Sequence, residues 1–530
     1  MRSSSLMKTA SVLAFALAAV VPSAFADVKP ARIFNENMVL QRDAEVPVWG
    51  WADPGEQVEV SFAGQTKSTT ANDKGEWSVR LAPLALNKTG ETMTIKGKNT
   101  IELKNILVGD VWLCAGQSNM EMNFTWGIMD GEKFIAESKN YPQIRRIKVT
   151  RKAAPAPVAD VDASVWSVCS PETVQPFTAA GYFFARKLTK ELDSLPIGIL
   201  DDNWSGSKIE PFIPPEGFAL LPEFAARARA VWSNVPGREE WKAARGKYLA
   251  DLKAALPEAE KRFAEGREFS DILPRIDSLR DSERYNAMMA PIVRFPVKGV
   301  IWYQGCSNAG DDILYFKYMK ALIGGWRKVW KNPDMPFYFV QLAAYQITTT
   351  NPKGGEGYAR IREVQALALS IPNTGMACTI DIGNSRDIHP KNKIDVGERL
   401  ALWALAKTYG KKDLVFSGPM YRSMKIEGNR IRLSFDYADG LMTAVKNGYA
   451  KPVPAPEMKP ANFAVCDKNG NWFWADAVIE GNEVVVSAKE VAEPTAVRYA
   501  YRGCPVDLNM YNGAGLPMVP FRTDVPQENK

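Results

Sequence analysis

Between residues 27 and 103, apolar and polar positions alternate in short segments that are separated by turn-forming residues. Residues 57–62 alternate at period 2, and the turn sequence Asp53-Pro54-Gly55 precedes them. This alternation is typical of strands that bury only one face. The pattern therefore predicts a small antiparallel β domain over residues 27–103.

From about residue 104 to residue 410, continuous apolar runs of strand length alternate with longer segments of helical period. Such runs predict strands that are buried on both faces, and the alternation predicts a parallel sheet covered by helices. We predict a doubly wound α/β domain. Its expected strands are residues 111–115, 197–200, 297–303, 337–342 and 376–380, and its expected helices are residues 179–192, 315–330, 359–370 and 394–409.

Two further regions have their own character. Residues from about 214 to 284 are charged and alanine-rich, without a strand pattern, which predicts a helical insertion into the α/β domain. Alternation returns after residue 410, for example in residues 429–435, and a β-branched run follows in residues 484–487. We therefore predict a second β domain over residues 411–530.

The first 26 residues have the composition of a secretory signal. Arg2 and Lys8 precede an apolar run over residues 10–21, and the small-residue site Ala24-Phe25-Ala26 follows. We expect cleavage near Ala26 and export to the periplasm or the medium. No later segment approaches the roughly 20 consecutive apolar residues of a membrane-spanning helix, so we expect no membrane insertion.

Composition excludes several classes of function. The net charge of +6 arises from 66 basic and 60 acidic residues that are spread along the chain, which argues against nucleic-acid binding. The six cysteines form no CxxC pair. The chain has one histidine, His389, so a metal site built from several histidines is excluded and any imidazole base must be this residue.

Four loops that follow predicted strands carry residues suited to acyl transfer. Ser118 follows the first strand, Gly206 and Asn308 follow the next two, and Asp387 and His389 precede the last helix. Taken singly, each is more commonly a turn or helix-cap residue. Because the carboxyl ends of parallel strands share one edge of a sheet, the loops together would supply a nucleophile, a base and oxyanion donors.

Two other functions suit an exported chain with β domains. Glycoside hydrolysis by two carboxylates is one, and non-catalytic carbohydrate binding is the other. Neither explains a serine and the single histidine at the same sheet edge, so we favour a serine esterase.

Several motifs carry a resemblance to a known family. The segments GQSNM (residues 116–120), VIWYQGCSN (300–308), DIHPKNK (387–393) and GERLALWALA (397–406) resemble the SGNH hydrolases, and within them the sialate O-acetylesterase family. Tyr511-Asn512 and residues 520–524 are also similar. The resemblance spans about residues 31–524. It implies an α/β fold, a flavodoxin-like SGNH domain flanked by N- and C-terminal β-sandwich-like domains, with no metal or cofactor.

The resemblance also implies a function and a set of roles. The expected activity is hydrolysis of O-acetyl esters on a glycan or sialic acid, with acetylated xylan or pectin as the alternative substrates. The implied catalytic residues are Ser118, His389 and Asp387, the oxyanion hole is Ser118, Gly206 and Asn308, and the predicted substrate-binding residues are Gln117, Trp204 and Gln304.

Three positions depart from the family pattern. Cys306 stands where the family usually has glutamate, and Ser205 replaces the first glycine of a usual pair. Arg386 occupies the position, three residues before the histidine, at which the superfamily places its acid. Two arrangements therefore remain open, a triad completed by Asp387 and a Ser118–His389 dyad supported by a backbone carbonyl.

Overall fold

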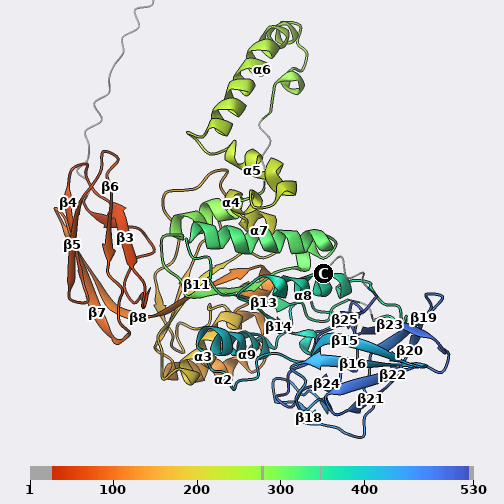
Figure 1. The fold of residues 1–530 in the computed structure, drawn as a ribbon. Coiled ribbons are helices and arrows are strands. Elements are labelled where there is room, and N and C mark those ends of the chain that lie inside the picture. Colours follow the sequence, from red (N-terminus) through yellow and green to blue (C-terminus); the bar gives the residue numbers. More distant parts are fainter. Residues whose placement is uncertain (1–26, 276–279, 347, 525–530) are drawn as a thin grey trace, which may run out of the picture.

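A computed structural model describes residues 27–275, 280–346 and 348–524 (Figure 1). The predicted signal peptide lies outside the described residues. No helix in the described part of the chain is long and apolar enough to cross a bilayer.

The N-terminal β domain consists of two facing sheets. One has the order β1-β3-β6, and the other is built from β4, β5, β7 and the first part of β8, with β2 parallel to β8. The strands are β1 (Lys29–Pro30), β2 (Val39–Gln41), β3 (Val46–Trp51), β4 (Gln57–Phe62), β5 (Gln65–Thr70), β6 (Glu76–Leu81), β7 (Asn87–Lys96) and β8 (Thr100–Gly116). The boundary that we predicted after residue 103 falls inside β8, because this 17-residue strand continues into the central sheet.

The central sheet has the order β10-β9-β11-β8-β12-β13-β14. All of these strands are parallel except β10 at the edge. The strands that follow β8 are β9 (Ile144–Lys148), β10 (Ser167–Val168), β11 (Ile197–Asn203), β12 (Gly299–Tyr303), β13 (Phe337–Gln341) and β14 (Thr374–Cys378). The segment β11-β8-β12-β13-β14 has the 2-1-3-4-5 order of a flavodoxin-like sheet, which confirms the predicted fold class.

Helices cover both faces of this sheet, with α2, α3 and α9 on one side and α4, α7 and α8 on the other (Figure 1). The helices are α1 (Ser118–Glu121), α2 (Gly131–Glu137), α3 (Ala179–Glu191), α4 (Pro215–Phe218), α5 (Ala225–Trp232), α6 (Glu239–Ala264), α7 (Ile313–Val329), α8 (Ala359–Leu367) and α9 (Lys393–Trp403). The four helices predicted for this domain correspond to α3, α7, α8 and α9.

Short 3₁₀ and π segments fill the connections. The 3₁₀ segments are η1 (Phe124–Trp126), η2 (Ser138–Asn140), η3 (Glu210–Phe212), η4 (Pro222–Phe224), η5 (Ser270–Ile272), η7 (Ala290–Ile292), η8 (Cys306–Asn308), η9 (Ala368–Ser370) and η10 (Ile380–Ile382), and the π segments are η6 (Tyr285–Met289) and η11 (Ala404–Thr408).

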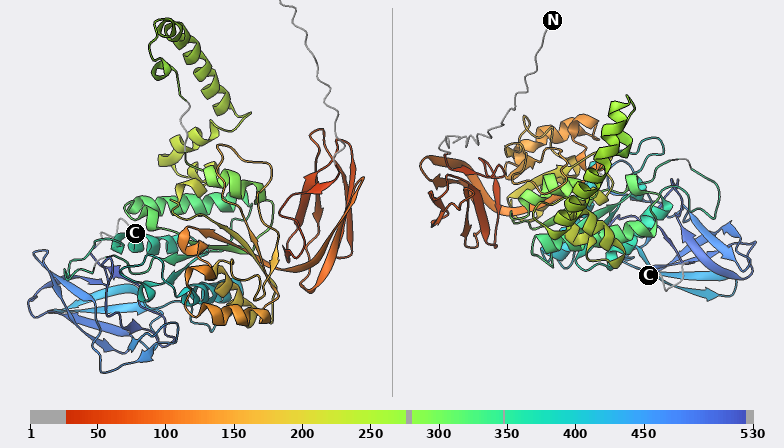
Figure 2. Two further views of the ribbon diagram at one scale, coloured as in Figure 1. Left: turned by 180° about the vertical axis from the view of Figure 1, so that it is seen from behind. Right: turned by 90° about the horizontal axis from the view of Figure 1, so that it is seen from above.

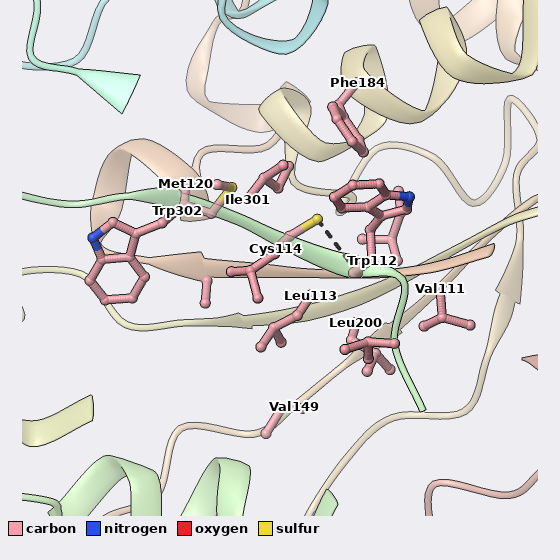
Figure 3. Packing of buried hydrophobic residues seen from close by; sticks show 14 of the residues in the cluster. Val111, Trp112, Leu113, Cys114, Met120, Val149, Phe184, Leu200, Ile301 and Trp302 are labelled. Atoms are coloured by element: carbon pink, nitrogen blue, oxygen red, sulfur yellow. Dashed lines mark hydrogen bonds between the residues drawn. The ribbon is translucent and has the colours of Figure 1, made fainter. Parts of the chain in front are cut away.

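The core of the central sheet explains the continuous apolar run at residues 111–115, all of which are fully buried. Trp112 packs edge-to-face on Phe184 of α3 at a centroid distance of 4.9 Å (Figure 3). On the other side of the sheet Trp302 of β12 packs on Trp326 of α7 at 5.8 Å. A strand that packs against helices on both faces has no polar side to alternate.

The helical insertion contains α4, α5 and α6, and α6 projects away from the body of the protein (Figures 1 and 2). Few side chains of α6 are buried, because this helix has little to pack against.

The C-terminal β domain has a separate hydrophobic core. Its sheets have the orders β15-β16-β22-β21, β18-β17-β24 and β20-β19-β23-β25. The strands are β15 (Met420–Glu427), β16 (Arg430–Asp436), β17 (Met442–Val445), β18 (Val453–Pro454), β19 (Phe463–Asp467), β20 (Trp472–Trp474), β21 (Asp476–Glu480), β22 (Glu483–Ser487), β23 (Pro494–Tyr499), β24 (Met510–Tyr511) and β25 (Phe521–Arg522).

The C-terminal domain is joined to the α/β domain by buried and partly buried polar contacts. Arg362 of α8 donates to the backbone carbonyls of Arg502 and Gly503, and Arg522 pairs with Glu363 at 2.7 Å.

Candidate active site

Ser118 lies directly after β8, where the sheet reverses its strand order. Gly116 ends the strand at a φ of 144°, and a Cβ there would lie 2.3 Å from the carbonyl oxygen of Tyr303 on β12. Only glycine fits this close approach. The amide of Gln117 then donates to the same carbonyl at 3.0 Å, and Ser118 begins α1. The sharp turn exposes 8% of Ser118 at the carboxyl edge of the sheet.

His389 reaches Ser118 from the loop between β14 and α9. Its Nε2 atom lies 2.8 Å from the Ser118 Oγ atom. The imidazole also packs edge-on against Trp126, at 5.5 Å between ring centroids. The structure therefore brings the predicted nucleophile and the predicted base into hydrogen-bond contact.

Asp387 contacts His389 mainly through the backbone. Its Oδ1 atom accepts the backbone N–H of His389 at 2.8 Å but lies 3.7 Å from the ring Nδ1 atom. The latter distance is too long for a hydrogen bond. Burial raises the pKa of Asp387, but the His389 N–H and the Lys391 ammonium lower it more, so the pKa stays below 3.8 and the group is ionised.

A buried lysine that we did not predict supports the histidine loop. The Lys393 Nζ atom donates to Asn119 Oδ1 at 2.6 Å, and the Asn119 amide nitrogen donates to the carbonyl of Ile388 at 3.0 Å. Both residues fall in motifs noted above, GQSNM and DIHPKNK, but nothing in their spacing indicates that they meet. Burial lowers the pKa of Lys393 to about 7.

The surroundings of His389 favour its neutral form. Burial lowers its pKa, and the positive charges of Lys393 and Lys391 lower it further, against a smaller opposing effect of Asp387. The resulting pKa is below the ordinary value of 6.5. A neutral imidazole can accept the proton of a serine hydroxyl, so this shift suits a general base.

Gly206 lies in the exposed loop after β11, at a φ of 71°. Among the described residues, no acceptor pairs with the backbone N–H of Gly206 or of Ser118. Ser205 binds Glu121 of α1 through both its amide and its hydroxyl, and Arg151 pairs with the same carboxylate. Glu121 was not predicted, and it ties the Gly206 loop to the helix that Ser118 begins.

Asn308 is hydrogen-bonded inside the protein in the loop after β12. Its amide nitrogen donates to Glu210 Oε2 at 3.0 Å and to Asp311 Oδ2 at 2.7 Å, which uses both hydrogens. Its Oδ1 atom accepts from the Ile209 amide at 3.0 Å. Asn308 therefore joins the loops after β11 and β12, where both of its amide hydrogens have acceptors, and its donation to an oxyanion stays a prediction.

Gln304 and Gln117 also make hydrogen bonds inside the protein. Gln304 is fully buried, and it donates to Ser207 O and Asn308 Oδ1 and accepts from the Tyr315 hydroxyl. Gln117 is 3% exposed and accepts the amide of Gly305 at 3.0 Å. The fold thus uses polar groups of both side chains internally, and their contact with substrate stays a prediction.

Trp204 and Cys306 are partly exposed beside these loops. The Trp204 amide donates to Gly116 O at 3.0 Å, which places the residue next to the strand end that precedes Ser118. Burial raises the pKa of the Cys306 thiol, and Tyr358, Lys393 and Asn119 lower it in part. The raised pKa keeps the Cys306 thiol neutral even though the charge of Lys393 acts to lower it.

Comparison with known proteins points to one family. Residues 274–406 match the family model described as carbohydrate esterase, sialic acid-specific acetylesterase. The chain is 27% identical to sialate O-acetylesterase of Rattus norvegicus, over 93% of each chain, and 27% identical to that of Homo sapiens, over 93% and 91%. A carbohydrate acetylesterase from Xanthomonas citri is 32% identical, with 94% of this chain and all of that one covered and a TM-score of 0.76.

Proposed function

The chain belongs to the sialic acid-specific acetylesterase family of carbohydrate esterases, and we propose that it removes O-acetyl groups from sialic acid through an acetyl-enzyme on Ser118. Carbohydrate O-acetyl ester hydrolysis is the activity of this family. These relatives give no support to the alternatives of glycoside hydrolysis and non-catalytic carbohydrate binding. The residue roles and the acidic sugar are our proposal.

The 2.8 Å contact between His389 Nε2 and Ser118 Oγ supports the mechanism more than any other observation. His389 accepts the hydroxyl proton as Ser118 Oγ attacks the acetyl carbonyl. The tetrahedral oxyanion is held by the backbone N–H groups of Ser118 and Gly206, which have no other acceptor among the described residues.

Collapse of this intermediate breaks the bond to the sugar oxygen, which takes the proton from His389 and leaves as the alcohol. Water then loses a proton to His389 and attacks the acetyl-enzyme, and acetate departs as Ser118 Oγ regains its proton. Asp387 and Ile388 keep the imidazole in place through the backbone of the loop, so the arrangement resembles a dyad with a nearby carboxylate more than a hydrogen-bonded triad.

The sialic acid substrate is supported by the names of the relatives, which are sialate O-acetylesterases. The test is acetate release by the purified protein from O-acetylated sialic acid, acetylated xylan and acetylated pectin. We expect the sialic acid ester to have the highest kcat/KM, and Ser118→Ala to abolish release from every substrate. If the wild type prefers xylan or pectin and Ser118→Ala abolishes this activity, the sialic acid substrate is refuted and the esterase activity of Ser118 is retained.

We also propose that the protein is exported after cleavage near Ala26, on the composition of residues 1–26. N-terminal sequencing of the protein from cell fractions tests this. A mature chain beginning at Asp27 outside the cytoplasm is the expected result, and a cytoplasmic chain that retains Met1 would contradict it.

A further inference from the structure

Arg284 is a half-buried cation that lies against two aromatic rings. Its guanidinium carbon is 4.5 Å from the ring centroid of Trp204 and 5.6 Å from that of Phe212. Its Nε atom is buried, and no hydrogen-bond partner for it occurs among the described residues. Within residues 27–275, 280–346 and 348–524, which the structure describes, no carboxylate lies within ion-pair distance of the Arg284 guanidinium. Burial accordingly lowers the pKa of Arg284.

An arrangement of this kind has an energetic cost. A cation that loses water needs an anion or hydrogen-bond acceptors in exchange. The rings compensate only in part, because a cation–π contact is weaker than a charge-assisted hydrogen bond. The Arg284 guanidinium can therefore still bind an anionic group.

The position of Arg284 is fixed by its neighbours. The Ser282 hydroxyl donates to Ile213 O at 2.6 Å, and the Ser282 amide donates to Glu210 O at 3.2 Å. These bonds hold the segment that carries Arg284 against the connection that follows the Gly206 loop. Trp204, on which Arg284 lies, is two residues before Gly206 and is hydrogen-bonded to Gly116 at the end of β8.

We propose that Arg284 recognises an anionic group of the sugar, and that for sialic acid this group is the C1 carboxylate. The inference rests on the proposed function, since it assigns a recognition residue to the same substrate. A guanidinium can bind a carboxylate through two parallel N–H donors, and Trp204 fixes its plane. Arg284 is thus a specificity residue, and it takes no part in the acyl transfer itself.

The test compares two substrates that differ only in this charge, 9-O-acetyl-N-acetylneuraminic acid and its C1 carboxamide. We expect the wild-type kcat/KM to be about 10- to 100-fold higher for the acid. Arg284→Met should bring this ratio close to one. Arg280→Met is the matched control, because Arg280 is exposed on the same segment, and it should retain the wild-type ratio.

The ratio is measured within one protein, so partial loss of folded enzyme does not alter it. If Arg284→Met does not fold, Arg284→Lys serves instead, with an intermediate ratio expected because the charge remains without the planar fork. A wild type that hydrolyses acid and amide equally, or a variant that keeps the full preference, overturns the role of Arg284 and leaves the sialic acid substrate in place. A wild type that hydrolyses neither compound refutes the substrate itself.

Discussion

The Nζ atom of Lys393 lies 2.6 Å from Oδ1 of Asn119, and this buried contact joins the start of α9 to the helix that begins at Ser118. Asn119 in turn donates to the carbonyl of Ile388, the residue before His389. The geometry of nucleophile and base therefore depends on a side chain that touches neither of the reacting atoms.

Replacing Lys393 by methionine should affect both rate and pH dependence. Loss of the contact with Asn119 loosens the loop of His389, and misplacement of about 1 Å can cost roughly 100-fold, so we expect kcat to fall about 10- to 100-fold. Removing the positive charge also raises the pKa of His389, which moves the midpoint of the pH profile of kcat/KM upward. Kinetics with a neutral aryl acetate from pH 4 to pH 9 measure both effects.

Lys391→Met is the matched control for this charge effect. The Lys391 side chain is 44% exposed, so salt screens its charge and the upward shift should be smaller and should vanish at high ionic strength. An unchanged midpoint in Lys393→Met would contradict the electrostatic influence of Lys393.

The wild-type pH profile follows from His389 being the only imidazole. Burial and the two lysines lower its pKa, so the neutral base persists below pH 6.5. We expect kcat/KM to rise with pH and to reach its plateau with a midpoint below 6.5. A midpoint above 6.5 would mean that the favourable effect of Asp387 outweighs burial and the lysine charges.

Asp387→Ala should have a modest effect. In a hydrogen-bonded triad, loss of the carboxylate function costs about 10⁴ in kcat. Here the Asp387 oxygen lies 3.7 Å from the His389 Nδ1 atom, so we expect a loss of about 10-fold. Because Asp387 raises the pKa of His389, its removal should move the pH midpoint further down, opposite in sign to Lys393→Met. A loss near 10⁴ would show that the loop closes into a triad during turnover.

The substitution Asn308→Ala distinguishes a positioning role of Asn308 from a role as oxyanion donor. The substitution leaves Glu210, Asp311 and the Ile209 amide without their partner, and each buried group that loses its hydrogen bond costs about 1–3 kcal/mol. We expect a clear drop in the melting temperature together with a fall in kcat. A variant with unchanged stability and a 10²- to 10³-fold lower kcat would instead support the predicted donor role.

The fold could be predicted because burial on both faces leaves a continuous apolar signal, as at residues 111–115. The missed strand β9 lacks that signal, since Arg145 and Arg146 are both buried in it. Arg146 is acceptable there because it pairs with Asp201 on the neighbouring β11 at 2.8 Å. A pairing between residues that are 55 positions apart has no local sequence signature.

The same reason limits prediction of the site. The contact between Ser118 and His389 could be predicted because their proposed roles require particular residue types after particular strands. The hydrogen-bond partners of Asn308 and Gln304 could not be predicted. In the sequence, an amide side chain that contacts a substrate is indistinguishable from one that contacts a buried polar group. In the sequence, Lys393 is an ordinary lysine in a polar segment. Its contact with Asn119 is evident only in the folded structure.

Asp202 offers a test of burial that is independent of catalysis. Strand alternation separates it from Asp201 and Asn203, which face Lys148, and neither of its carboxylate oxygens has a hydrogen-bond partner among the described residues. Burial raises the pKa of Asp202 to about 7. The folded protein therefore binds a proton here that the unfolded chain releases near its ordinary pKa of 3.8.

It follows that this group's contribution to stability is fully present below about pH 4 and is lost as the pH rises through about 7. Asp202→Asn removes the titration while keeping the size and shape of the side chain. We expect the free energy of unfolding of the variant, relative to the wild type, to increase steadily between pH 4 and pH 7 and to level off above. Urea unfolding at matched pH values measures this difference, in which the other titrating groups cancel. A difference that is flat across the range would show that Asp202 is already ionised and paired in the folded protein.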